Sequence, residues 1–210
     1  MSIKVDKVEE GLPISVVIPL GQKRKPFFYD YVLPMIEANN PIEIIINNNE
    51  GTAPKKRNEG FGKATQPYVF FCDDDCILPV SYFQSLYDCL EAHPDKSYAY
   101  SGYRGVVFNP TTEPHNNFII PGIEFTAEML RRQNFINTTS LIRTKDFPGF
   151  DENIKRFQDW DLWLTMLEQG KVGILVPSQS FLSFFNDEGQ TNVNNSYVDA
   201  FNIIKNKHSL

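Results

Sequence analysis

The sequence lacks the features that define membrane, secreted or nucleic-acid-binding proteins. It contains no run of about 18 apolar residues and so predicts no membrane-spanning helix. Cysteine is scarce: Cys72, Cys76 and Cys89 are too few for a disulfide framework and are typical of free thiols in a reducing compartment. Positive charge is not in excess, because the net charge is -6, and a nucleic-acid surface is not expected. The opening MSIKVDKVEEGLP lacks the charged-then-apolar order of a signal peptide, so we expect a cytoplasmic protein.

The remaining composition is that of an ordinary globular protein. Hydrophobic residues make up 41% of the chain and charged residues 22%. A length of 210 residues favours one sizeable core over two very small ones. We therefore expect a single domain.

Short apolar runs alternate with helix-like segments in the first half of the chain. Residues 14–20 (ISVVIPL), 42–49 (IEIIINNN) and 68–72 (YVFFC) predict buried strands. Residues 27–40 and 53–65 predict helices, and after Pro79 apolar residues recur at three- or four-residue spacing, which indicates an amphipathic helix. This alternation, with short connections, predicts an α/β fold with a mostly parallel central sheet flanked by helices.

The second half is less regular. Residues 98–108 predict a bent strand, 136–143 a further strand and 172–177 a late strand. Residues 109–122 are rich in turn formers and predict a long exposed loop that is mobile when no ligand is bound. Residues 157–170 predict a helix that ends at Gly170.

Polar clusters follow each of the first three predicted strands, at residues 20–25, 47–50 and 73–75. In an open α/β sheet, ligands bind beyond the carboxyl ends of the strands, so these clusters predict a binding site. The alternative is that these clusters are ordinary polar turns. That interpretation accounts well for a single cluster and less well for three clusters that follow successive strands.

Three consecutive aspartates follow the third strand. In an extended segment Asp73 and Asp75 point to the same side, and their oxygens suit Mn²⁺ or Mg²⁺, which can also hold a diphosphate. The alternative is a solvated turn that caps the next helix. Upstream, the guanidinium of Arg57 could bind a nucleotide base and Lys56 a phosphate, unless both lie on a solvated helix face.

Two more carboxylates lie at the start of the helix over residues 157–170. The helix dipole favours an ionised Asp159, which could accept a proton as a general base; a plain N-cap is the alternative. Asp161 falls within the first turn of the helix, where its negative charge is expected mainly to stabilise the helix dipole. Trp160 could present its ring to a sugar, whereas the position of Trp163 on the apolar stripe predicts a core residue.

In order, these motifs resemble the GT-A nucleotide-sugar glycosyltransferases of family-2 type, over roughly residues 14–192. ISVVIP and IEIIINNNEG are similar to the first two strands of that fold, KRNEGFGKA to its Arg-Asn-x-Gly helix, FFCDDDCILP to its D-x-D metal motif, and GFDENIKRFQDWDLWL to its acidic motif. Three positions depart from the family pattern. Asn47–Asn49 replace an Asp that contacts uracil, Gln158 replaces a Glu, and FFNDEGQT stands where a metal-binding His is usual, with Asn186 or Asp187 as substitute. The chain also resembles glycosyltransferase domains of large algal (chlorella) viruses that act in capsid glycosylation, for which the compartment would be the host cytoplasm.

The resemblance implies a division of the chain and a set of site residues. A nucleotide-binding part is expected at about 12–105, an acceptor and catalytic part at about 106–192 and a C-terminal tail at 193–210. Asp159 would be the base, Asp73, Asp75 and Asp187 the metal ligands, and Trp160 and Asp161 acceptor residues. The nucleotide site would comprise Pro19, Leu20, Gly21, Asn47, Asn49, Lys56, Arg57, Asp73 and Asp74.

The resemblance implies metal-dependent transfer of a sugar from a nucleotide-sugar donor, most simply UDP-linked, to a hydroxyl of a glycan or glycoprotein. A single displacement would invert the anomeric centre, and a retaining outcome stays open. Two alternatives also stay open. A nucleotidyltransferase would use a similar sheet and metal, although PLGQKRKP matches its glycine-rich loop poorly. A non-catalytic nucleotide-sugar-binding module would explain the replaced Glu and His.

Overall fold

A computed structural model gives the fold and describes residues 2–107, 117–185 and 197–210. The strands in this part of the chain are β1 (Ile3–Lys7), β2 (Leu12–Pro19), β3 (Pro41–Asn47), β4 (Tyr68–Phe71), β5 (Cys76–Ile77), β6 (Tyr98–Val107), β7 (Phe118–Ile120), β8 (Leu141–Arg143) and β9 (Gly173–Phe185). The α-helices are α1 (Lys25–Phe27), α2 (Leu33–Glu37), α3 (Ala53–Phe61), α4 (Tyr82–Ala92), α5 (Ala127–Arg132), α6 (Gln158–Glu168) and α7 (Tyr197–Lys207). Short 3-10 helices lie at Gln22–Arg24 and Thr144–Asp146, and a π-helical turn at Phe28–Val32 joins α1 to α2.

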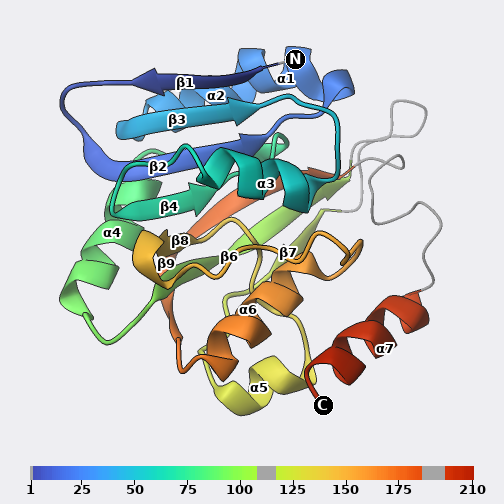
Figure 1. Cartoon of the computed structure of the whole chain (residues 1–210). Coiled ribbons are helices and arrows are strands. Elements are labelled where there is room, and N and C mark those ends of the chain that lie inside the picture. The colour runs from blue at the N-terminus through green and yellow to red at the C-terminus, as the bar shows by residue number, and fades with distance from the viewer. Residues whose placement is uncertain (1, 108–116, 186–196) are drawn as a thin grey trace.

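All nine described strands form one curled sheet in the order β1-β3-β2-β4-β8-β6-β9-β5, with β7 paired to β6 (Figure 1). The strands β3, β2 and β4 run parallel to one another, and so do β6 and β9. Antiparallel pairs join β4 to β8 and β8 to β6, and they add β1, β5 and β7 at the edges. The predicted α/β class is confirmed, and the parallel strands β3, β2 and β4 are the ones that the first three apolar runs predicted.

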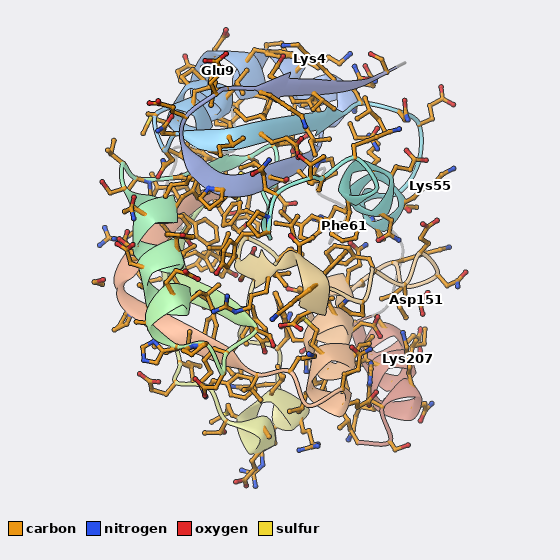
Figure 2. The ribbon with its side chains drawn as sticks, turned by 60° about the vertical axis from the view of Figure 1, so that its left-hand side comes forward. Lys4, Glu9, Lys55, Phe61, Asp151 and Lys207 are labelled. Atoms are coloured by element: carbon orange, nitrogen blue, oxygen red, sulfur yellow. The ribbon has the colours of Figure 1, made fainter. Side chains whose placement is uncertain are left out.

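Helices cover both faces of the sheet because its central strands are apolar on both sides. On β2, Val16 and Ile18 face the core that contains α2 and α4, while Val17 faces the core that contains α6. The ring of Phe61, on α3, packs into the second core, and Figure 2 shows it pointing inward while Lys55 points outward. With β2, β3 and β4 buried between these layers, only the strand ends stay open, and in open α/β sheets ligands bind beyond the carboxyl ends.

Several predicted elements are confirmed. The helices α3, α4 and α6 lie where the patterns predicted them, and Gly170 ends α6 with a positive φ of 74°. The predicted bend in β6 coincides with a register shift between Tyr100 and Gly102 in its pairing with β9.

The prediction of one long loop over residues 109–122 is wrong in part, because Phe118–Ile120 forms β7 and pairs with β6. This strand has only three residues, too few for an alternating pattern to be visible in the sequence. Residues 108–116 lie outside the described part of the chain.

The segment predicted as a C-terminal tail contains α7. Ile204 of this helix is fully buried against the core, and Lys207 forms a salt bridge of 2.8 Å with Asp151, which Figure 2 shows on the neighbouring segment. The C-terminal segment is therefore packed onto the fold. No helix in the described ranges is long and apolar enough to cross a membrane.

Candidate active site

The carboxyl ends of β2 and β3 meet as the alternation predicted. The backbone N–H of Leu20 donates to the carbonyl of Asn47 over 2.9 Å, and Nζ of Lys56 donates to the carbonyl of Leu20 over 2.8 Å. Lys56 is buried, and this burial lowers the pKa of its ammonium, an effect that the charge of Asp74 opposes. Lys56 thus lies beneath the loop that follows Pro19, the last residue of β2.

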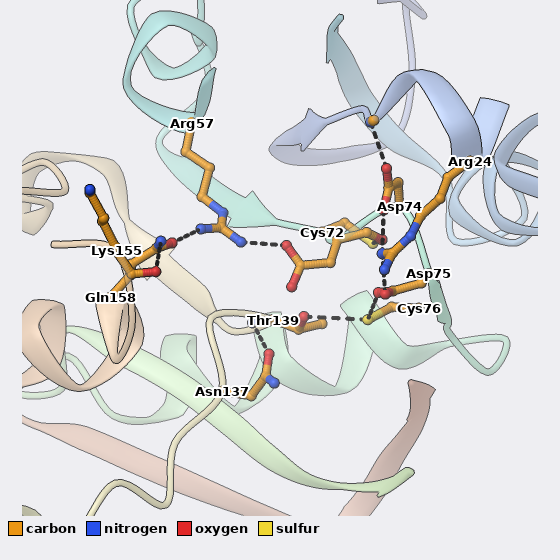
Figure 3. Close-up of polar contacts among 12 residues, drawn as sticks. Arg24, Arg57, Cys72, Asp74, Asp75, Cys76, Asn137, Thr139, Lys155 and Gln158 are labelled. Atoms are coloured by element: carbon orange, nitrogen blue, oxygen red, sulfur yellow. Dashed lines mark hydrogen bonds and ion pairs between the residues drawn. The ribbon is translucent and has the colours of Figure 1, made fainter. Parts of the chain in front are cut away.

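The Asp triplet follows β4 after Cys72, at the same edge, because β4 runs parallel to β2; Figure 3 shows Asp74 and Asp75. Asp73, Asp75 and Cys76 can bring one ligand atom each within 4.8 Å of one another. Burial raises the pKa of the Cys76 thiol well above its ordinary value, so the sulfur stays protonated and is a poor ligand. The two carboxylates are left as hard oxygen donors, which fit Mn²⁺ or Mg²⁺ better than zinc.

Two arginines balance the charge of the triplet (Figure 3). Nη1 of Arg24 donates to Oδ1 of Asp74 over 2.8 Å and to Oδ2 of Asp75, while Nη2 of Arg57 donates to Oδ1 of Asp73 over 2.5 Å. Burial and the neighbouring charge of Asp73 raise the pKa of Asp75 to about 7, against the opposing effect of Arg24. Three adjacent carboxylates are therefore held together by two guanidinium groups.

Asp74, which shares Nη1 of Arg24 with Asp75, also holds the loop after β2. Its Oδ2 accepts from the backbone N–H of Gly21 over 2.6 Å, and a Cβ at Gly21 would lie only 3.1 Å from this oxygen. Asp74 is also buried. Its position fits a role in shaping the loop.

Beside this loop lies an open pocket of about 420 Å³ at the ends of β2 and β3. It is lined by Gln22, Lys25, Asn48, Asn49, Glu50, Gly51 and Lys56. Asn47 does not reach the pocket: it is fully buried, its Nδ2 donates to Glu59 and to the carbonyl of Lys56, and its Oδ1 accepts from the backbone of Asn49. Of the two predicted asparagines, only Asn49 lines the pocket.

Asp159 lies in the first turn of α6, as the sequence predicted. Its side chain is half-buried, its Oδ1 accepts from the backbone N–H of Trp160 over 2.9 Å, and the side chain of Asn134 donates to it. Burial raises the pKa of Asp159, while these hydrogen bonds and the charge of Arg57 oppose the rise. Since Arg57 also bonds Gln158 over 3.0 Å, one guanidinium spans from the Asp triplet to the start of α6.

Two predicted acceptor residues do not face this site. Trp160 is 1% exposed and its Nε1 donates to the carbonyl of Leu130 over 2.7 Å, so the prediction that its ring meets a sugar is wrong. The first turn places this side chain on the core face of α6. Asp161 is 2% exposed and its Oδ1 bonds His208 over 2.9 Å and Lys207 over 2.7 Å, which directs it toward the C-terminal segment. Trp163 is fully buried, as predicted.

Asp187, the third predicted metal ligand, lies outside the described residues. Two other residues belong to the site although the sequence did not single them out: Arg24, within the polar cluster after β2, and Asn134, which follows α5. The basic run QKRK signalled positive charge after β2 but not which side chain reaches the triplet. For Asn134 we find no sequence signal.

An α/β sheet with a polar pocket, a carboxylate pair and the start of α6 carrying Asp159 has the architecture of the glycosyltransferases with the GT-A fold. Residues 29–154 match the family described as glycosyl transferase family 2, and the chain belongs to this family. No curated protein sequence matches the chain at a significant level.

Solved structures support the fold. The chain superposes on Staphylococcus aureus TarS residues 1–349 in complex with UDP-GlcNAc with a TM-score of 0.64 and 12% identity, over 92% of this chain and 66% of that one. It superposes on GalNAc-T7 with UDP, GalNAc and Mn²⁺ with a TM-score of 0.56 and 12% identity, over 95% of this chain and 48% of that one. The chain therefore spans slightly less than two thirds of the TarS chain and about half of the GalNAc-T7 chain.

Proposed function

We propose that this glycosyltransferase moves a sugar from a UDP-sugar to an acceptor hydroxyl in a metal-dependent, inverting reaction. The observation that carries the proposal is the arrangement of three groups along one edge of the sheet. These are the polar pocket after β2 and β3, the carboxylate pair Asp73 and Asp75, and Asp159, whose neighbour Gln158 accepts from the same Arg57 guanidinium that bonds Asp73.

The nucleotide would bind at the pocket and the diphosphate beside the triplet. Asn49 and Gly51 line the pocket with polar groups for the base. Lys56, Arg24 and Arg57 supply positive charge next to the diphosphate position. TarS and GalNAc-T7 were solved with UDP-linked or UDP ligands, which supports UDP as the nucleotide here.

Asp73 and Asp75 would hold Mn²⁺ or Mg²⁺, which when bound neutralises the charge of the departing diphosphate. Asp187 is proposed as a third ligand from sequence alone. The Mn²⁺ in the GalNAc-T7 structure supports a divalent cation at such a site.

Asp159 would act as the general base. The acceptor oxygen attacks the anomeric carbon while its proton passes to the carboxylate of Asp159, and the bond from the anomeric carbon to the diphosphate oxygen breaks. The raised pKa of Asp159 suits this role, because a stronger base removes a hydroxyl proton more readily. Attack from the side opposite the leaving diphosphate inverts the anomeric centre.

The acceptor is proposed to be a glycan or glycoprotein, and the compartment to be cytoplasmic. The resemblance to algal-virus domains of capsid glycosylation stays a sequence-based prediction that would place the reaction in a host cytoplasm.

A thermal-shift panel of nucleotide sugars with and without Mn²⁺ tests the proposal. A ligand that binds only the folded state raises the melting temperature. We expect UDP-sugars to stabilise the protein more with Mn²⁺ than without it, and the reaction to release UDP. A nucleotidyltransferase would release pyrophosphate instead, and stabilisation without any turnover would indicate a binding module.

A further inference from the structure

Beyond the Asp triplet, the sheet carries a group of aromatic side chains that we call the aromatic row: Tyr103 on β6, Phe118 on β7 and Phe185 on β9. The ring centroid of Phe118 lies 6.4 Å from that of Tyr103 and 5.4 Å from that of Phe185. Phe118 is 37% exposed, and Tyr103 and Phe185 are half-buried. These adjacent rings leave apolar area open that a ligand can cover.

Strand register places the aromatic row beside the triplet. Cys76, the residue that follows the triplet, pairs with Ser183 on β9, Ser183 pairs with Gly105 on β6, and Gly105 pairs with Phe118 on β7. Directly paired residues lie close together on one face of a sheet. Because neighbouring strands are about 4.8 Å apart, the backbone of Gly105 is roughly 10 Å from that of Cys76. The aromatic row is thus within the reach of one or two sugar rings from the carboxylates.

Tyr103 also lies near Asp159, the proposed base. Burial raises the pKa of its phenol, and the charge of Asp159 raises it further. Such an effect requires that the phenol lie near Asp159. The ring of Tyr103 stacks on Phe181 with centroids 5.5 Å apart and an angle of 19° between the planes, and Phe181 is 1% exposed. A buried neighbour therefore fixes this ring at the site.

Gly105 of β6 determines the position of the Phe118 ring. A Cβ at Gly105 would lie 2.1 Å from Cζ of Phe118, so the ring lies directly over the backbone of the glycine. Any larger residue at position 105 must push this ring aside. Gly105 therefore keeps the ring on the face that carries Tyr103.

We propose that the aromatic row is the acceptor platform of the enzyme and that the acceptor is a saccharide, whose pyranose ring packs on Phe118 and Tyr103. The C–H groups on one face of a pyranose carry partial positive charge, and an aromatic ring offers them a negative face. A serine or threonine of a polypeptide has no such face to cover. The inference rests on the proposed function, because it places the acceptor of that reaction.

Two binding measurements on the same preparations test the inference. Calorimetry with UDP and Mg²⁺ reports the donor site, and saturation-transfer NMR with a panel of methyl pyranosides, with UDP and Mg²⁺ present, reports the platform. The variants are Phe118→Ala, which removes a ring, and Gly105→Ala, which displaces it. Ile119→Ala is the matched control, since Ile119 is 67% exposed on the opposite face of β7.

We expect at least one methyl pyranoside to bind the parent protein through its C–H face. Phe118→Ala and Gly105→Ala should weaken this binding about tenfold, the worth of a good aromatic contact, with unchanged affinity for UDP. The control should bind both ligands as the parent does. If the parent binds UDP but no pyranoside, or if Phe118→Ala binds the pyranoside as well as the parent, the platform is refuted while the proposed function stands. If the parent does not bind UDP, the proposed function fails, and the platform fails with it.

Discussion

Nη1 of Arg57 donates to Oε1 of Gln158 over 3.0 Å, which joins two residues 101 positions apart in the chain. The same guanidinium also bonds Asp73, so it connects the Asp triplet to the helix that carries Asp159. The family that the chain resembles usually has a glutamate at position 158. An amide accepts the hydrogen bond without adding a negative charge, and Arg57 keeps its charge for Asp73. The replacement is therefore compatible with an intact site.

We predict that Arg57→Ala weakens UDP binding at least about tenfold and lowers the free energy of unfolding by about 1–3 kcal/mol, the worth of hydrogen bonds to a charged group. The side chain is 5% exposed, and its guanidinium also lies 5.2 Å from the ring of Phe150. Calorimetry with UDP and urea unfolding measure the two effects. Lys55→Ala, on the exposed face of the same helix, should change neither. Equal UDP affinity in Arg57→Ala and parent would show that Arg57 is only a structural residue.

A second prediction concerns pH and the metal. Asp75 has a pKa raised to about 7, and a cation binds the carboxylate but not the acid. Mn²⁺ affinity should therefore fall as the pH drops below 7, by about tenfold per pH unit. Calorimetry with Mn²⁺ between about pH 5.5 and 8 tests this.

The same pKa has a consequence for the metal-free protein. Between pH 3.8 and about 7 the folded state binds more protons at Asp75 than the unfolded chain does. The contribution of this group to stability therefore falls as the pH rises through that window. Asp75→Asn should remove both this slope and Mn²⁺ binding, whereas Asp88→Asn, an exposed aspartate on α4, should change neither. Unchanged Mn²⁺ affinity in Asp75→Asn would exclude Asp75 as a ligand.

A third prediction concerns how α7 is attached. The side chains of Asp161 and His208 are 3% and 1% exposed and lie 2.9 Å apart. Asp161 keeps Lys207 and His208 keeps Glu168 when the other partner is lost, so Asp161→Asn and His208→Ala should each lower the free energy of unfolding by about 1–3 kcal/mol, the worth of a buried hydrogen bond to a charged group. A double-mutant cycle should return a coupling energy of about 1–3 kcal/mol. Glu168→Gln is the control, because this partner of His208 is 53% exposed and should cost less than about 1 kcal/mol. A coupling energy near zero would show that the Asp161–His208 pair does not hold the C-terminal segment on the fold.

The central strands and the triplet could be predicted because local patterns encode them. ISVVIPL and YVFFC are apolar on both faces, and the sheet buries both faces. Asp74 and Asp75 lie in a turn, with the N–H of Cys76 donating to the carbonyl of Asp73, and not in the extended segment that the sequence predicted; the oxygens of Asp73 and Asp75 nevertheless lie close enough to share an ion. The apolar stripe of α6 correctly predicted that Trp163 lies in the core.

The predictions failed where contacts between residues far apart in the sequence determine the structure. β7 has three residues and forms only because β6 pairs with it, and α7 follows no strong apolar stripe, with Ala200 and Ile204 as its buried residues. Trp160 looked available because it lies between two acids, yet packing of α6 against α5 buries it. Nothing local to Arg24 shows that it reaches Asp74 and Asp75, fifty residues further along the chain.

The last prediction separates Asp159 from Asp161. A base acts on the acceptor in the transition state and contributes little to holding the donor, so Asp159→Asn should cut transfer by roughly 10²–10⁴-fold with little change in donor affinity. Asp161 bonds His208 and Lys207 of the C-terminal segment, so Asp161→Asn should lower stability while the folded fraction keeps its rate. Transfer assays measured as UDP release, donor titrations and urea unfolding on both variants make the comparison. Since burial raises the pKa of Asp159, the rate should also fall as the pH drops through that raised value, because the protonated acid cannot take a proton from the acceptor. An inactive Asp161→Asn beside an active Asp159→Asn would reverse the assignment of the two carboxylates.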